Sequence, residues 1–138
     1  MRVVGLDLGG RRIGVAVSDA SGTVASPHSV LERRGDTVTD HATIAALVAE
    51  LRAERVVVGL PLSLDGTVGP AASAVRDEIE ALAALLPVPV EAHDERLTTV
   101  SAERALTAQK VRARDRRRVV DKVAAAVILQ SWLDAPRD

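Results

Sequence analysis

Three acidic residues occupy positions where a charged side chain is costly or unexpected. Asp7 lies within an apolar segment near the start of the chain, Glu95 follows a second apolar segment, and Asp121 precedes the apolar stretch 123–129. A carboxylate inside a sheet is poorly solvated unless a positive charge compensates it. Converging carboxylates would repel one another unless divalent ions neutralised them, and Mg²⁺ or Mn²⁺ suits such oxygen ligands. If they converge, these residues predict a metal centre.

Two divalent ions held about 3.5–4 Å apart can orient a water and stabilise the departing oxygen of a phosphodiester, so such a centre could hydrolyse nucleic acid. Each carboxylate also has a simpler explanation. Asp7 could be a strand acid that is hydrogen-bonded to a turn, and Glu95 could be an exposed partner of Arg96. Asp121 could favour the N-terminal dipole of a helix. Taken singly, Glu95 and Asp121 fit the simpler explanation better, while for Asp7 the two are balanced.

Basic residues near these acids could hold the phosphates of a substrate. Arg11 and Arg12 follow the first apolar segment, and Arg96 adjoins Glu95, where it could orient the carboxylate or contact substrate. A basic run precedes Asp121 and is expected to bind phosphate, although a solvated loop is the usual role of such runs. Its members are Lys110, Arg112, Arg114, Arg116, Arg117 and Arg118. For the two arginines of the first turn, an ordinary charged turn is an equally good explanation.

The bulk composition limits the classes of protein to which the chain can belong. Its 138 residues make one ordinary domain, and a hydrophobic content of 47% excludes a disordered chain. The net charge of -1 means that any basic surface is local. The absence of cysteine excludes thiolate catalysis and favours the cytoplasm, and no apolar run is long enough to cross a bilayer. Trp132 is the only aromatic residue, so contacts with nucleic acid should depend on phosphates rather than on base stacking.

The first half of the chain predicts three strands followed by a helix. Alternating apolar residues indicate a hairpin of strands over 3–8 and 13–18. A third strand is expected over 23–31, and Pro27 within it indicates an irregular or edge position. The polar segment 33–40 is expected to be a loop. A helix then follows, with Ile44, Leu47, Val48 and Leu51 on one face.

The second half predicts parallel strands alternating with helices. The β-branched run 56–60 has no polar alternation, as expected of a central strand covered on both faces. After a loop over 61–69, a helix should start at Pro70 and stop before Pro87. An edge strand is expected over 88–92. Thr98 or Thr99 could then cap a helix running to about residue 108, and Asp121 is expected to open a final helix that ends before Pro136. These elements predict one α/β domain, residues 1–138, with a mixed five-stranded sheet of three antiparallel and two parallel strands and helices on both faces.

Four segments, in this order along nearly the whole chain, resemble the YqgF/RuvX family. They are residues 7–19, 58–62 with Asp65-Gly66, 94–99 and 121–130. Members of that family are described as pre-16S rRNA nucleases and as Holliday junction resolvase-like proteins. The resemblance implies a ribonuclease H-like fold and divalent metal bound by Asp7, Glu95 and Asp121. Arg11 stands where the family often has lysine, which keeps the charge.

The resemblance leaves several functions open. Maturation of the 5′ end of pre-16S ribosomal RNA is preferred, with cleavage of a branched DNA junction as the alternative. A junction enzyme would need two active sites and hence a homodimer, whereas no residue here distinguishes a monomer from a dimer. Phosphoryl transfer from ATP is disfavoured because sugar kinases close two such domains around the nucleotide. A non-catalytic nucleic-acid binder remains the third hypothesis.

Overall fold

The computed structural model describes the backbone of residues 1–98 and 113–135 and, except at 97 and 113–121, their side chains. Five strands form one sheet in the order β3-β2-β1-β4-β5. The antiparallel unit β1–β2–β3 is continued by β4 and β5, which run parallel to β1. The strands are β1 Val3–Leu8, β2 Arg12–Ser18, β3 Ala25–Glu32, β4 Arg55–Leu60 and β5 Val90–Asp94. The predicted mixed five-stranded sheet is confirmed.

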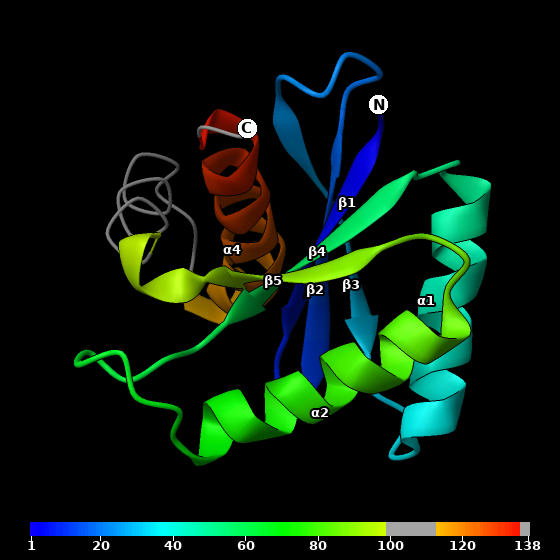
Figure 1. Cartoon of the computed structure of the whole chain (residues 1–138). Helices are drawn as coiled ribbons and strands as arrows, with labels where there is room; N and C mark the ends of the chain where they lie inside the picture. Colours follow the sequence, from blue (N-terminus) through cyan, green and yellow to red (C-terminus); the bar gives the residue numbers. More distant parts are fainter. Residues whose placement is uncertain (99–112, 136–138) are drawn as a thin grey trace.

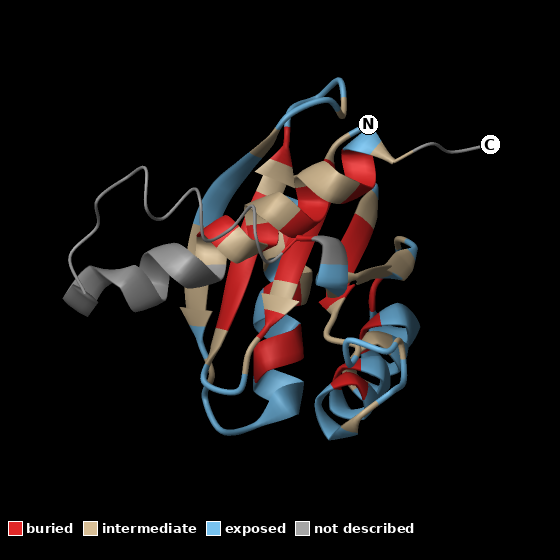
Figure 2. Ribbon diagram, turned by 90° about the vertical axis from the view of Figure 1, so that its left-hand side faces the viewer, coloured by how far each residue is buried: buried red, intermediate tan, exposed pale blue. Residues whose placement is uncertain are grey.

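Helices cover both faces of this sheet (Figure 1). They are α1 Thr37–Glu50, α2 Pro70–Leu85 and α4 Ala113–Asp134, with a short 3₁₀ turn η1 at Glu95–Leu97. α1 and α2 pack on one face and α4 on the other, so that buried residues concentrate along the strands and the helix sides that face them (Figure 2). Among the described residues, no helix is both long enough and apolar enough to span a bilayer.

The two edge strands are the ones that contain or follow a proline. In β3, Pro27 pairs with Ala16 next to a shift in register, which is the irregular edge position expected of proline. β3 begins at Ala25, two residues later than predicted. β5 begins at Val90, directly after Pro89, and ends at Asp94 rather than at residue 92.

The start of α1 corrects the prediction of a loop over 33–40. The Asp36 carboxylate accepts hydrogen bonds from the backbone of Val38 at 3.0 Å and from the hydroxyl of Thr39 at 2.9 Å. This cap satisfies a backbone donor that has no partner within the helix, so α1 begins at Thr37. The apolar stripe of the helix was recognised, whereas its first turn is polar and was mistaken for a loop.

α4 also begins earlier than predicted, at Ala113. Two contacts show that α4 runs antiparallel to β4. The Trp132 ring lies 5.7 Å from the guanidinium of Arg55, which begins β4, whereas Ile128, earlier in α4, lies against Gly59 near the end of β4. The prediction that Asp121 opens this helix is therefore wrong. Residues 113–118, for which a solvated loop was considered, are helical. The helix predicted after Thr99 lies outside the described residues.

Candidate active site

Asp7 lies near the end of β1, on the face of the sheet that α4 covers. Val3 packs into the core beneath α4, and a Cβ placed at Gly5 would lie 2.7 Å from the Cβ of Leu129. Successive residues of a strand point to opposite faces, so Asp7, two residues beyond Gly5, belongs to the same face. Its partner in β2 is Gly14, which adds no side chain to that face.

Glu95 directly follows β5, and its side chain lies over β4. Its Cγ and Oε2 are each 3.2 Å from the position that a Cβ would take at Gly59, so a larger residue there would displace it. Leu6 of β1 pairs with Val58 of β4, which makes Gly59 the neighbour of Asp7 in the adjoining strand. The structure therefore brings Asp7 and Glu95 to the same end of the sheet.

The Glu95 carboxyl occupies a poorly solvated position, and none of the described residues places a compensating positive charge beside it. Burial raises the pKa of Glu95, and the negative charge of Asp94 raises it further. Within the part of the chain that the structure describes, its side chain makes no hydrogen bond or ion pair. Burial lowers the pKa of the neighbouring His93 and so disfavours its charged form, and its Nε2 lies 2.9 Å from Ser131 Oγ. A bound cation would therefore favour the ionised form of this carboxyl.

Position 121 lies in the third turn of α4, one turn before the buried residue Ala125. Because α4 runs antiparallel to β1 and β4, its backbone at 121 lies towards the end of the sheet that carries Asp7. A role for Asp121 at the helix N-terminal dipole is excluded, since the helix starts eight residues earlier. Its role as a metal ligand stays a prediction. Among residues with described side chains, no three of His, Asp or Glu are grouped to hold a metal ion.

Arg96 pairs with Asp94 rather than with Glu95. Its Nε donates to the two carboxylate oxygens of Asp94 at 3.0 and 2.9 Å, and its Nη2 donates to one of them at 2.6 Å. Its Nη1 lies 3.4 Å from the carbonyl oxygen of Leu64 in the loop between β4 and α2. The simpler explanation of Glu95, as the partner of Arg96, is therefore wrong, and substrate binding by Arg96 stays a prediction.

The remaining basic residues predicted to bind substrate lie in three places. Arg11 is exposed in the turn between β1 and β2, and Arg12 begins β2, where its Nε is 3.5 Å from the carboxylate of Glu32 in β3. Arg114, Arg116 and Arg117 belong to the first turns of α4, and Lys110 and Arg112 lie outside the described residues. Contacts of these residues with phosphate stay predictions. Thr98, considered as a helix cap, ends η1 instead, and its hydroxyl donates to the carbonyl of Glu95 at 2.8 Å.

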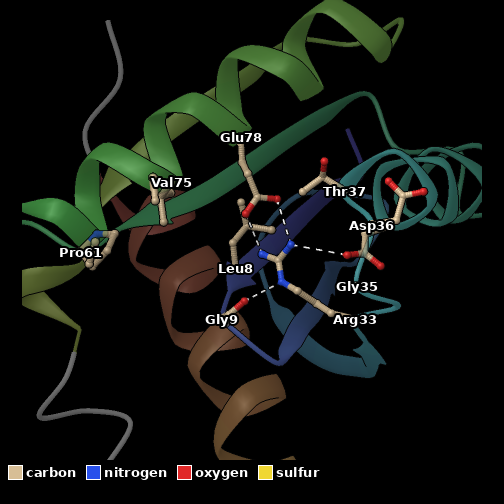
Figure 3. Close-up of a pocket in the computed structure, with 13 residues that line it drawn as sticks. Leu8, Gly9, Arg33, Gly35, Asp36, Thr37, Pro61, Val75 and Glu78 are labelled. Atoms are coloured by element: carbon tan, nitrogen blue, oxygen red, sulfur yellow. Dashed lines mark hydrogen bonds and ion pairs between the residues drawn. The ribbon is translucent and has the colours of Figure 1, made fainter.

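Arg33, to which the sequence assigned no role, lies at the centre of a polar cluster on the opposite face of the sheet (Figure 3). Its Nε donates to the carbonyl of Gly9 at 2.7 Å, and its Nη1 and Nη2 donate to Glu78 at 3.2 and 2.7 Å. Asp40 is 3.6 Å from Arg33, and His41 Nε2 is 2.8 Å from Glu78. We call these four side chains, Arg33, Asp40, His41 and Glu78, the Glu78 cluster.

The Glu78 cluster fixes the turn that follows Asp7 and borders a cavity of about 520 Å³ between that turn, α1 and α2. Burial alone would raise the pKa of Glu78, but hydrogen bonds from Arg33 and His41 outweigh it, so the pKa falls below its usual value. The helical spacing of the sequence could have indicated this cluster. Asp40 and Glu78 stand on the buried faces of α1 and α2, where helical spacing calls for apolar residues.

Comparison with known proteins identifies the family to which the chain belongs. The family model described as "RuvX: Holliday junction resolvase" matches residues 1–135. The chain belongs to the RuvX family. A relative from Mycobacterium sp. (strain KMS), described as "Putative pre-16S rRNA nuclease", is 49% identical over 99% of this chain and 81% of that protein. A relative from Anaeromyxobacter dehalogenans (strain 2CP-C) with the same description is 49% identical over 97% of each chain. RuvX membership confirms the predicted family and the prediction of a nuclease.

The fold is shared more widely than the sequence. The structure of T. thermophilus RuvC in complex with a Holliday junction substrate aligns with a TM-score of 0.61, over 99% of this RuvX chain and 98% of that chain. The sequence identity is 17%, so this likeness concerns the fold alone. It confirms the RuvC-like, ribonuclease H-like architecture that the resemblance implied.

Proposed function

We propose that this RuvX nuclease cleaves the precursor of 16S ribosomal RNA during maturation of its 5′ end, with divalent metal held by Asp7, Glu95 and Asp121. One observation carries the site: the half-buried Glu95 carboxylate lies over Gly59, in the strand next to Asp7, without a cationic partner among the described residues. The substrate is supported by the description that the relatives from Mycobacterium and Anaeromyxobacter share.

The residues suit Mg²⁺ or Mn²⁺, because both ions prefer carboxylate oxygens and a desolvated carboxylate gains most from a bound cation. When bound, divalent metal would supply a water activated for attack and stabilise the departing oxygen of the phosphodiester. In this assignment Asp7 and Glu95 are ligands rather than general bases. Gly59 provides the space in which Glu95 lies, and the exposed Arg11 in the turn after Asp7 would hold a phosphate of the substrate.

Cleavage of a branched DNA junction is the second candidate, and the description of the matching family as Holliday junction resolvases favours it. A junction has two strands to cut, so this activity would require two copies of the site and hence a homodimer. Ribosomal RNA maturation makes no such demand. Substrate choice and oligomeric state are therefore linked, and one set of experiments tests both.

Purified protein should be offered the pre-16S 5′ leader and a synthetic four-way junction, each with Mg²⁺ and with Mn²⁺. We expect cleavage of the RNA, loss of cleavage in Asp7→Asn with binding largely retained, and normal cleavage in Asp77→Asn, an exposed carboxylate on α2. Depletion of the protein in cells should leave extended 16S 5′ ends. Cleavage that survives Asp7→Asn would show that the activity is a contaminant or that the metal site is misassigned. Junction cleavage alone would favour the second candidate.

A further inference from the structure

The loop between β4 and α2, residues 61–69, presents an apolar side chain to solvent beside the candidate active site. Leu64 is 95% exposed, the highest value for any large apolar residue that the structure describes. Val68 of the same loop is 45% exposed. Exposure of one leucine is common on protein surfaces, so a role for Leu64 depends on the structure of the loop and on its location.

Local hydrogen bonds hold the corner of this loop in a defined turn. The amide of Gly66 donates to the carbonyl of Ser63 at 2.8 Å, and the amide of Ser63 donates to the carbonyl of Thr67 at 3.0 Å. Gly66 has a φ of +87°, which favours glycine. The Asp65 carboxylate accepts from the amide and the hydroxyl of Thr67 at 3.0 and 2.7 Å. None of these bonds uses the side chain of Leu64, so a polar residue there would form the same turn.

Arg96 links this turn to the active site. Its Nη1 lies 3.4 Å from the Leu64 carbonyl and 3.1 Å from the position of a Cβ at Gly66, while its other nitrogens are bound to Asp94. Arg96 directly follows Glu95 in η1, and the loop itself starts two residues after Gly59. The corner that carries Leu64 is therefore tied to the segment that carries the proposed metal ligand, and Figure 1 shows the loop projecting from the body of the domain.

Apolar side chains at such a position suit the bases of nucleic acid. Proteins insert leucine and similar side chains between base steps and so unstack them. Aromatic residues usually serve to stack with single-stranded bases, but Trp132, the only aromatic residue of this chain, is 6% exposed and lies on the side of α4 that packs into the core. An aliphatic side chain must therefore make any apolar contact with a base.

We propose that Leu64 contacts a base beside the cleaved phosphodiester and unstacks it from its neighbour, so that the enzyme prefers a boundary between paired and unpaired RNA. This inference rests on the proposed nuclease site. Arg96 and Asp94 are positioning residues for this contact between Leu64 and the base. Asp94 binds Arg96, and Arg96 holds the turn that carries Leu64. Leu64 carries no charge, so it would contribute a contact with a base without adding a contact with a phosphate.

Leu64→Ser tests the proposal, and Leu85→Ser is its matched control. Leu85 is also an exposed leucine, at 53%, but it ends α2, whose 16 residues separate it from the loop by roughly 24 Å. The probe is a partly double-stranded RNA with 2-aminopurine at each position around the boundary in turn. Binding is measured with Ca²⁺ in place of Mg²⁺, over a range of salt concentrations.

Wild type and Leu85→Ser should change the fluorescence of 2-aminopurine at one or two positions. Leu64→Ser should abolish that change and weaken binding about fivefold to tenfold, with an unchanged slope against salt concentration because phosphate contacts remain. Leu64→Met should restore the fluorescence change, and all variants should unfold at the wild-type temperature.

The proposal is wrong if Leu64→Ser matches Leu85→Ser in fluorescence while the wild type binds and cleaves RNA, and in that case the nuclease site stands. If the wild type neither binds nor cleaves any RNA probe, both the proposed function and the role of Leu64 fall.

Discussion

Glu78 and Asp40 on one face of the sheet and Glu95 on the other lie at the same end of the sheet, and they differ in how their charge is compensated. Glu78 and Asp40 face Arg33, whose guanidinium donates to both oxygens of Glu78. Glu95 directly follows β5, which lies two strands from the β1 strand of Asp7. Its side chain makes no hydrogen bond or ion pair with the described residues. The pKa of Glu78 is lowered and that of Glu95 is raised.

This difference distinguishes a structural role from a binding role. Breaking a compensated buried pair is costly, so the Glu78 cluster should stabilise the fold and the position of the Gly9 turn. An uncompensated buried carboxylate costs stability, and such groups cluster at functional sites, where a ligand can repay the cost. Both faces carry carboxylates near this end of the sheet. What separates them is that Arg33 faces Glu78 and Asp40, whereas Glu95 has no cationic partner among the described residues.

The largest expected contrast is in cleavage rate. Glu95→Gln should lower single-turnover cleavage at saturating Mg²⁺ about 1,000-fold, since metal supplies several kcal/mol of transition-state stabilisation and each tenfold corresponds to about 1.4 kcal/mol. Glu78→Gln, the same change on the other face, should lower it at most a few-fold when assayed at a temperature at which it is folded. An equal loss in both variants would remove the distinction between Glu95 and Glu78.

The second contrast is in stability. Arg33→Met should lower the free energy of unfolding in urea by about 3 kcal/mol, because Glu78 and Asp40 are left buried without their cation. Arg76→Met, an exposed arginine two residues before Glu78 on α2, is the control and should change little. If Glu78→Leu is added to Arg33→Met, part of the loss should be recovered. Independent, additive effects of the two changes would contradict a coupled cluster.

The smallest contrast is in the pH dependence of stability, measured in EDTA. A raised pKa means that folding favours protonated Glu95, so its contribution is present below pH 4.5, the ordinary glutamate value, and is lost as pH rises through its folded pKa. Glu95→Gln should therefore be more stable than wild type at pH 7, by about 1 kcal/mol, and should lose this advantage below pH 4.5.

Glu78 should behave in the opposite way. Its lowered pKa stabilises the fold above pH 4.5, and that contribution is lost as pH falls through the folded pKa. Glu78→Gln should therefore be less stable than wild type at pH 7 and approach it in acid. Shifts of the same sign for both variants would contradict the difference in compensation on which the comparison depends.

Much of the fold was predictable because it depends on short-range patterns. The alternation around Asp7 placed the first strand, the unbroken run 56–60 placed a central strand, and Pro70 marked the start of α2. The starts of α1 and α4 were missed because their first turns are polar, and a polar segment has the same composition in a helix as in a loop. The RuvX family was predicted from the resemblance of four segments and not from the periodicity of the sequence.

By itself, the sequence determined which chemistry is available: carboxylates where apolar residues are expected, no cysteine, and one aromatic residue. Only the tertiary structure decided the partners of those groups. Arg96 might equally have paired with either neighbouring acid, and it pairs with Asp94. Arg33 reaches Glu78 across 45 residues of chain, and Gly59 provides the space for Glu95. Charge compensation depends on distances between residues that are remote in sequence, and packing of α1, α2 and α4 on the sheet sets those distances.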